Sequence, residues 1–203
     1  MTTFILDGIW GRHSRWERLR RRIEKSIGAC RIWRYDNSGR ASLETIGAAL
    51  RDELHGTGGP LNLVGYSMGG LVIRESLREP HELSVRRAVF LHSPHRGSFF
   101  AHAYNLPACR EMRPGSAFLA RLNETTWNIP TLATWCALDA VVVPGQSACW
   151  RNAVTVIQSP VPAHAWPVIS PGIHKAVVQF LKNDPAPAAL PLSGIRPGMD
   201  RLP

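Results

Sequence analysis

The chain lacks the features of a membrane-spanning or secreted protein. No apolar run approaches the roughly 20 residues that a membrane helix needs. The first residues, MTTFILDGIWGRH, have neither the basic start nor the long apolar segment of a secretory signal. We therefore expect a cytoplasmic protein.

Cysteine is scarce as well. The four cysteines form no CxxC pair and have no zinc-like spacing. In a cytoplasmic protein we expect them to be reduced, with Cys30 and Cys136 as small core residues of two strands. A bridge from Cys149 to Cys136 or Cys109 is an alternative only for an exported protein. No cluster of metal ligands is visible, so we expect no metal site.

Acidic residues are few: 15 Asp and Glu stand against 24 Lys and Arg, which gives a formal net charge of +9. Much of the excess lies in residues 12–25, RHSRWERLRRRIEK. Such a run is typical of a nucleic-acid or anionic-membrane contact, or of the solvated face of a helix. We favour the helix, because Trp16, Leu19 and Ile23 are spaced to face inward and no nucleic-acid-binding motif accompanies the charge. We expect no nucleic-acid partner and, at most, a weak attraction to an anionic membrane surface.

Apolar strand-like runs alternate with amphipathic helical stretches along the chain. Strands are predicted at residues 3–9, 29–35, 61–67, 85–94, 131–139 and 153–161, and helices at 13–26, 42–54, 68–79 and 171–182. Residues 97–128 show no regular period. The pattern predicts a three-layer α/β fold, with a mostly parallel sheet of about six strands and helices on both faces. Residues 1–183 would form this single domain, and the proline-rich residues 184–203 a disordered tail.

The segment GYSMGG, residues 65–70, lies between a predicted strand and a predicted helix. It fits the pattern G-x-S-x-G, in which the glycines allow a turn so tight that the serine is held in a strained conformation. The hydroxyl is thereby raised above the sheet, beside the N-terminus of the next helix. A lone match is weak, but the flanking strand and helix are the context that the chemistry needs. We predict that Ser67 is a nucleophile and that the Met68 N–H stabilises an oxyanion.

A nucleophilic serine needs a histidine base and an orienting carboxylate, which in this architecture follow in the chain order Ser, acid, His. Asp139 is predicted to end the strand at 131–139, at a sheet edge where catalytic groups gather. Glu111 and Glu124 lie in the region without a regular period, and Asp184 comes too late. We therefore choose Asp139; the alternative is an ordinary turn aspartate.

His164 is the preferred base among the eight histidines. It follows the last predicted strand, in SPVPAHAWPVISP, where a loop can return over Ser67 before the final helix. His174 is the rival, but it lies within that predicted helix. A second oxyanion donor should come from the loop after the first strand, LDGIWG, where we expect the N–H of Ile9 rather than that of Trp10.

Together these motifs resemble a small bacterial lipase or esterase of the α/β-hydrolase superfamily. GYSMGG resembles the GHSMGG of those lipases, SPHRGS (93–98) resembles TPHRGS, LDAVVVP (138–144) resembles the acid-bearing segment, and HAWPVISPGIHKAVVQFL resembles the histidine segment. The resemblance spans residues 3–182 and implies a Ser67–Asp139–His164 triad. It also implies a structural role for His95 and a small cap at about 99–128.

One position departs from the family pattern. The family's HGxxG after the first strand is DGIWG here, with Asp7 in place of a histidine that supports the oxyanion loop. This change and the bulky Trp10 bear on substrate size. The expected substrate contacts are Trp10, Tyr66, Phe99 and Phe100, although the aromatic residues of the cap fit a cap core equally well.

The resemblance implies a serine hydrolase that cleaves carboxylic esters through an acyl-enzyme, acting on a small-molecule ester or lipid without a cofactor. A thioesterase or acyltransferase with the same triad is the first alternative, since triad geometry does not separate these activities. A non-catalytic binding module, which would use the basic helix and the cap to recruit a lipid or a protein, is the second. Acyl-chain length and oligomeric state are left open.

Overall fold

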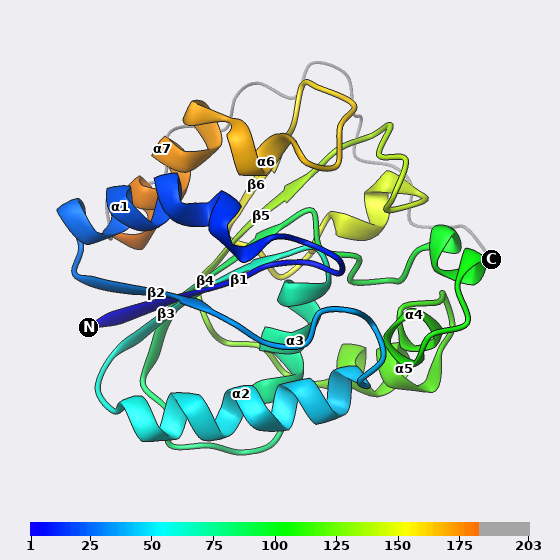
Figure 1. The fold of residues 1–203 in the computed structure, drawn as a ribbon, viewed down its shortest axis with the longest axis horizontal. Helices are drawn as coiled ribbons and strands as arrows, with labels where there is room; N and C mark the ends of the chain where they lie inside the picture. Colours follow the sequence, from blue (N-terminus) through cyan, green and yellow to red (C-terminus); the bar gives the residue numbers. More distant parts are fainter. Residues whose placement is uncertain (183–203) are drawn as a thin grey trace.

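The computed structural model describes residues 1–182, so the predicted tail lies outside the described residues. Six strands form one sheet in the order β2-β1-β3-β4-β5-β6, and every neighbouring pair is parallel (Figure 1). The strands are β1 (Thr2–Leu6), β2 (Ala29–Trp33), β3 (Leu61–Tyr66), β4 (Val85–Leu91), β5 (Thr131–Trp135) and β6 (Thr155–Gln158). The predicted number and direction of the strands are confirmed.

Helices cover both faces of this sheet, as predicted (Figure 1). One face carries α1 (Glu17–Ser26), α6 (Trp166–Ile169) and α7 (Pro171–Leu181), and the other carries α2 (Leu43–Thr57) and α3 (Met68–Ser76). The two layers follow from the strand residues, which alternate between the faces. Ile5 packs in the α1 and α7 layer, whereas its neighbours Phe4 and Leu6 pack in the α2 and α3 layer.

The basic segment forms a short 3₁₀ helix, η1 (His13–Trp16), followed by α1. Trp16, Leu19 and Ile23 are fully buried, which confirms the predicted inward stripe. On the outer side, Arg20 forms ion pairs with Glu17 and Glu24. The arginines of α1 therefore lie on the solvated face of a packed helix.

The region without a regular period, residues 97–128, contains helices that were not predicted. They are η2 (Phe99–Ala103), α4 (Pro107–Glu111) and α5 (Ala117–Glu124). Local caps begin two of them: Ser98 Oγ accepts from the Phe100 N–H at 3.1 Å, and Ser116 Oγ accepts from the Leu119 N–H at 3.2 Å. Helices this short show too few turns for a hydrophobic period, so the sequence pattern missed them.

The structure also bears on membrane-spanning helices and on the state of the cysteines. No helix within residues 1–182 has both the length and the apolar character needed to cross a membrane. The four cysteines are all free. Burial raises the pKa of the Cys30 thiol to about 12, so this group is an unreactive core residue.

Candidate active site

Ser67 occupies the turn between β3 and α3 with φ of 52° and ψ of −124°. A Cβ on Gly65 would lie 2.6 Å from the Gly70 Cα, and a Cβ on Gly69 would lie 2.7 Å from the Asp7 carbonyl oxygen. Neither approach leaves room for a side chain, so glycine is required at both positions. The glycines thus permit the tight turn that holds Ser67 at a positive φ at the head of α3.

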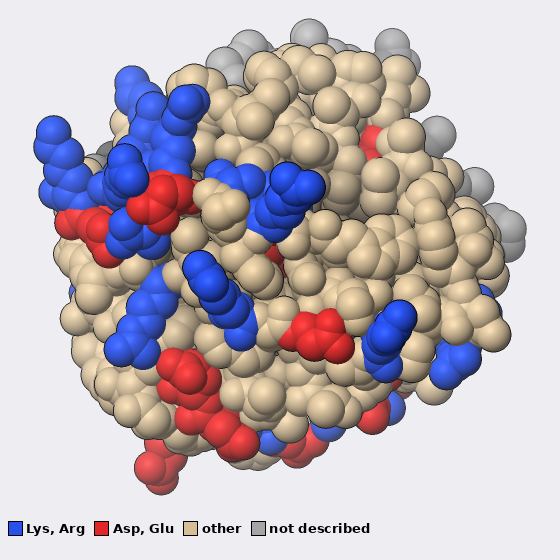
Figure 2. Space-filling view, viewed as in Figure 1, with Lys and Arg blue, Asp and Glu red and all other residues tan. Residues whose placement is uncertain are grey.

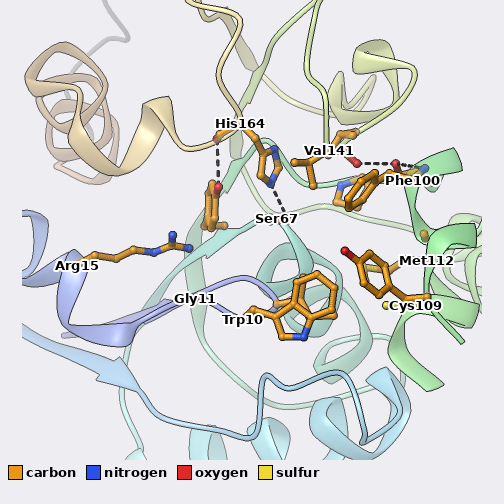
Figure 3. Close-up of a pocket in the computed structure, with 16 residues that line it drawn as sticks. Trp10, Gly11, Arg15, Ser67, Phe100, Cys109, Met112, Val141 and His164 are labelled. Atoms are coloured by element: carbon orange, nitrogen blue, oxygen red, sulfur yellow. Dashed lines mark hydrogen bonds between the residues drawn. The ribbon is translucent and has the colours of Figure 1, made fainter. Parts of the chain in front are cut away.

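The structure brings the three predicted catalytic side chains together. Ser67 Oγ lies 3.0 Å from His164 Nε2 (Figure 3). On the other side of the ring, His164 Nδ1 lies 2.7 Å from Asp139 Oδ2. His164 comes from the loop between β6 and α6, where the Tyr66 hydroxyl donates to its carbonyl oxygen at 3.1 Å. The arrangement can pass a proton from the serine to an imidazole that a carboxylate holds in one orientation.

The prediction that Asp139 ends a strand is wrong. β5 stops at Trp135, and Asp139 lies in the loop that follows it. The strand stops early because the loop folds around the carboxylate: Asp139 Oδ1 accepts from the N–H groups of Val141 and Val142 at 2.8 and 2.9 Å. Burial raises the pKa of Asp139, but interactions with His164 and His92 lower it more. The carboxyl is therefore charged at neutral pH.

His92 is a component of the site that the sequence did not reveal. It is fully buried, its Nδ1 lies 3.4 Å from Asp139 Oδ2, and its Nε2 lies 2.8 Å from Ser159 Oγ. Burial lowers the pKa of His92 more than Asp139 raises it, so the imidazole is neutral at neutral pH. His92 follows β4 directly, and that position at the carboxyl edge of the sheet is the signal that could have identified it.

The ligand atoms of His92, Asp139 and His164 all lie within 4.8 Å of one another, a spacing that could hold a metal ion. His164 lies within hydrogen-bond distance of both Asp139 Oδ2 and Ser67 Oγ, whereas His92 Nδ1 has no hydrogen-bond partner among the described residues. Because one of the two histidines thus connects the carboxylate to Ser67, we interpret these groups as part of a hydrogen-bonded triad rather than as a metal site.

The other two histidines considered from the sequence have different surroundings. His174 is buried in α7, where its Nε2 lies 3.1 Å from the Pro167 carbonyl oxygen. His95 is buried against the rings of Phe90 and Trp150, with centroid distances of 5.0 and 4.2 Å. Neither is among the described residues that line the pocket at Ser67.

The loop after β1 lies directly against Ser67. A Cβ on Gly8 would lie only 2.8 Å from the Ser67 Cβ. The Trp10 N–H is occupied by the Asn37 carbonyl oxygen at 2.9 Å. The N–H groups of Ile9 and Met68, in contrast, have no hydrogen-bond partner within residues 1–182. Two backbone donors are thus left available near the serine.

Asp7 holds the loop after β1 in place through several hydrogen bonds. Its buried carboxylate accepts from the Gly8 N–H at 2.7 Å and from Arg15 Nε at 3.0 and 3.1 Å, and it also pairs with Arg15 Nη2. The Tyr35 hydroxyl donates to the Asp7 carbonyl oxygen, and Asn37 Nδ2 donates to the Gly8 carbonyl oxygen at 2.8 Å. Asp7, which stands where the lipases that the sequence resembles have a histidine, therefore holds the loop through an ion pair with Arg15 of η1.

A pocket of about 330 Å³ opens at Ser67 (Figure 3). Trp10, Tyr66 and Phe100 line it, whereas Phe99 is 60% exposed and is not among the described lining residues. The full lining consists of Ile9, Trp10, Gly11, Arg15, Tyr66, Ser67, Pro94, Ser98, Phe100, Ala101, Tyr104, Cys109, Met112, Val141, Val142 and His164. Residues from η2 and α4 thus form one wall, which fits the expected cap.

Backbone strain concentrates around this pocket. Within residues 1–182 the non-glycine residues with positive φ are Trp10, Ser67 and His92, with φ of 55°, 52° and 49°. Each follows a strand at the carboxyl edge of the sheet. Such conformations cost free energy and tend to cluster at functional sites, so their grouping supports a site at this edge.

Comparison with known proteins supports the fold. No protein-family model matches the sequence, and no curated protein matches it. Among solved structures, Aspergillus fumigatus lipase B superposes with a TM-score of 0.75 at 12% identity, over 92% of this chain and 54% of the lipase. A Bacillus licheniformis lipase in mature form superposes with a TM-score of 0.66 at 16% identity, over 88% of each chain.

A third solved structure is an extracellular α/β-hydrolase from a Paenibacillus species. It superposes with a TM-score of 0.63 at 14% identity, over 89% of this chain and 98% of that protein. At these identities the likeness establishes the fold rather than the reaction. The chain has the α/β-hydrolase fold.

Proposed function

We propose that the protein hydrolyses carboxylic esters through an acyl-enzyme on Ser67. The observation that carries this proposal is the continuous chain of contacts from Ser67 Oγ through His164 to Asp139, at 3.0 and 2.7 Å. The chain lies in a pocket at the head of α3, within a fold shared with solved lipases. Serine, imidazole and carboxylate in this order are the groups that acyl transfer needs.

In the proposed reaction, His164 Nε2 takes the Ser67 proton as Oγ attacks the ester carbonyl carbon. Asp139 holds the imidazole in the tautomer with Nδ1 protonated and stabilises the imidazolium that forms. The tetrahedral intermediate collapses when His164 returns the proton to the departing alkoxide. Water then attacks the acyl-enzyme with His164 again as the base, which releases the acid and restores Ser67.

The Ile9 and Met68 N–H groups are proposed to stabilise the negative oxygen of both tetrahedral intermediates. Their lack of another partner supports this role, and the Trp10 N–H is ruled out because Asn37 already engages it. Donors fixed before the reaction need no reorganisation when charge develops on the substrate, and that makes them effective.

The pocket favours esters with a small or medium acyl group. Its volume of about 330 Å³ lies at the lower end of the range of about 300–1,000 Å³ for small-molecule sites. Apolar side chains from the cap segment form one wall: Phe100, Ala101, Cys109 and Met112. Trp10 narrows the entrance beside the oxyanion loop, with its ring 4.6 Å from that of Tyr104.

Labelling with a fluorophosphonate probe tests the proposal directly. Wild type should label with a stoichiometry near one, and Ser67→Ala and His164→Ala should each abolish labelling, while His174→Ala should label like wild type. Labelling that persists in His164→Ala would assign the base elsewhere. A folded wild type that does not label would favour a binding module.

A substrate series then defines the reaction. We expect p-nitrophenyl butyrate and octanoate to be cleaved faster than palmitate, because a long chain exceeds the pocket volume. Parallel assays with acyl thioesters, and with an added acceptor alcohol, separate ester hydrolysis from thioesterase and acyltransferase activity. A higher kcat/KM on thioesters would replace the ester assignment.

A further inference from the structure

Arg15 stands out among the residues around the pocket. Of the described lining residues it is the only one with a permanent charge, and no carboxylate is among them. The other walls are largely aromatic and aliphatic. A single charged side chain in a largely apolar pocket is a candidate for a specific contact with the substrate.

The ion pair with Asp7 fixes the direction of this cation. Asp7 contacts Nε and Nη2 of Arg15 and leaves the second terminal nitrogen, Nη1, outside the pair. The Asp7 side chain is fully buried, whereas that of Arg15 is 30% exposed. A molecule entering the pocket therefore meets the guanidinium and not the carboxylate, and the guanidinium is already oriented before binding.

The ring of Tyr66 lies next to both Arg15 and His164, the proposed base. The Arg15 Cζ is 4.9 Å from the centroid of the Tyr66 ring, and that ring is 5.1 Å from the His164 ring. Figure 3 shows Arg15 approaching from one side, with Phe100, Cys109 and Met112 on the opposite side. The departing alkoxide must lie near His164 to receive its proton, so the leaving group faces Arg15 and the acyl group faces the cap.

We propose that Arg15 binds a carboxylate or phosphate on the alcohol portion of the substrate, so that the site selects anionic amphiphilic esters. This proposal rests on the proposed ester hydrolysis. An apolar acyl group would fill the wall formed by the cap, while a charge-assisted hydrogen bond from the guanidinium orients the leaving group.

The charge distribution around the site supports an anionic substrate. The chain carries a formal net charge of +9, and Figure 2 shows Lys and Arg side chains gathered over α1, with a few acidic side chains among them, next to the segment that holds Arg15. Fewer Lys and Arg side chains lie over α4 and α5 in the same view. Such a field attracts anions toward the Arg15 side of the pocket, and its effect weakens with salt.

A pair of chromogenic octanoates tests the proposal. 4-Nitro-3-octanoyloxybenzoate carries a carboxylate on its leaving group, and 2-nitrophenyl octanoate is the matched neutral ester. The readout is the ratio of kcat/KM for the anionic ester to that for the neutral ester. We expect Arg15→Gln to lower this ratio by at least about tenfold, mainly through KM, because one charge-assisted contact is lost. Arg15→Lys should lower it less, since the charge is kept and the planar fork is lost.

Control variants distinguish a loss of substrate binding from a loss of folding and from a change in net charge. Because Arg15→Gln leaves Asp7 buried without its partner, the double variant Asp7→Asn/Arg15→Gln is measured beside it. Arg21→Gln removes the same charge from a side chain that is 74% exposed and should leave the ratio unchanged. Added NaCl should lower the ratio of the wild-type enzyme, and this measurement does not depend on the folding of any variant. Benzoate and phenyl phosphate as competitive inhibitors show which oxyanion binds more tightly.

The outcomes are distinguishable. A wild type that fails to label with fluorophosphonate refutes the ester hydrolase itself. If labelling is normal but neither the Arg15 variants nor salt changes the ratio, the proposed role of Arg15 in binding is wrong. Arg15 would then only support the loop that contains Asp7. A ratio that falls as much in Arg21→Gln as in Arg15→Gln also overturns it, because net charge would then explain the preference.

Discussion

Two buried aspartates follow strands on either side of Ser67, and they serve different partners. Asp7 follows β1 and is engaged by an arginine and by the N–H of the next residue. Asp139 lies beyond β5 and is engaged by imidazoles on one oxygen and by two backbone N–H groups on the other. Each carboxylate is thus held on both of its oxygens, but only Asp139 lies beside imidazoles, the side chains that serve as acids and bases in catalysis.

The nature of the partner decides what a buried carboxylate can do. An arginine keeps its proton at all accessible pH values, so the Asp7 pair is a fixed support for the loop that carries Ile9. A histidine exchanges its proton in the working pH range, so the Asp139 pair can take part in a reaction cycle. Substitution of the two aspartates should therefore separate activity from stability.

Asp139→Asn is expected to have the largest effect on activity. The amide still fills the site, but it cannot stabilise an imidazolium at His164, and it can reverse the tautomer of the imidazole. We expect kcat/KM on p-nitrophenyl octanoate to fall by about 10³–10⁴-fold, as for removal of the carboxylate in a serine protease triad. Steady-state kinetics with purified, folded variant measure this. A loss below about tenfold would assign the orienting acid elsewhere.

Asp7→Asn should act mainly on stability. The variant loses the ion pair with Arg15 but keeps an acceptor for the Gly8 N–H, so we expect the free energy of unfolding to fall by about 1–3 kcal/mol. Urea unfolding at neutral pH measures this, with Asp52→Asn on the exposed face of α2 as the matched control. If Asp7→Asn reduced kcat/KM as strongly as Asp139→Asn at unchanged stability, the contrast between the two aspartates would be wrong.

The pH dependence of stability sharpens the comparison further. The pKa of Asp139 in the folded state lies below its unfolded value of about 3.9. The carboxylate therefore contributes stability that is present above the unfolded pKa and is lost as the pH falls through the folded pKa. Between about pH 5 and pH 1, unfolding free energy should drop more steeply in wild type than in Asp139→Asn. Parallel curves in urea titrations would contradict the lowered pKa.

His92→Gln is expected to have a smaller effect. The His92 ring lies 3.4 Å from the Asp139 oxygen that His164 contacts, and it helps to lower the pKa of that carboxyl. Its removal should therefore make the carboxylate more basic and move the acid limb of the kcat/KM profile to higher pH. Ser159→Ala removes the contact to His92 Nε2 and should move the profile in the same direction, by less. Profiles of both variants that overlay on that of wild type would show that His92 only packs beside the carboxylate.

The sheet and its helices could be predicted because their signals are local. β3 is buried at every residue and forms one apolar run in the sequence. α2 begins directly after Ser42, the first residue of the predicted helix, whose Oγ accepts from the Thr45 N–H at 3.0 Å. Ser67 could be chosen because its glycines restrict the backbone directly. The spatial meeting of Ser67 with His164 and Asp139 was anticipated because a parallel sheet gathers its loops at one edge.

What the sequence did not reveal depends on contacts between distant segments. Glu111 at the end of α4 accepts from the Leu43 N–H, so this short helix is held by α2 rather than by its own period. His92 contacts Asp139 and Ser159 across β4, β5 and β6. In the sequence, Arg15 looks like one more charge of a basic helix, although in the structure it pairs with Asp7 and lines the pocket. No motif with a fixed spacing joins the residues of such pairs, so their contacts could not have been predicted.

Trp10 gives the pocket an optical property of its own. It lies at the mouth with 48% of its surface exposed, its indole N–H donates to the Ser38 carbonyl oxygen at 3.0 Å, and its ring meets that of Tyr104. The other six tryptophans are buried or half-buried. Ligand that fills the pocket removes water from this one exposed indole, so the emission maximum should move to shorter wavelength. Trp10 should thus act as a fluorescent reporter of pocket occupancy, and it should do so even in Ser67→Ala, where no turnover is expected.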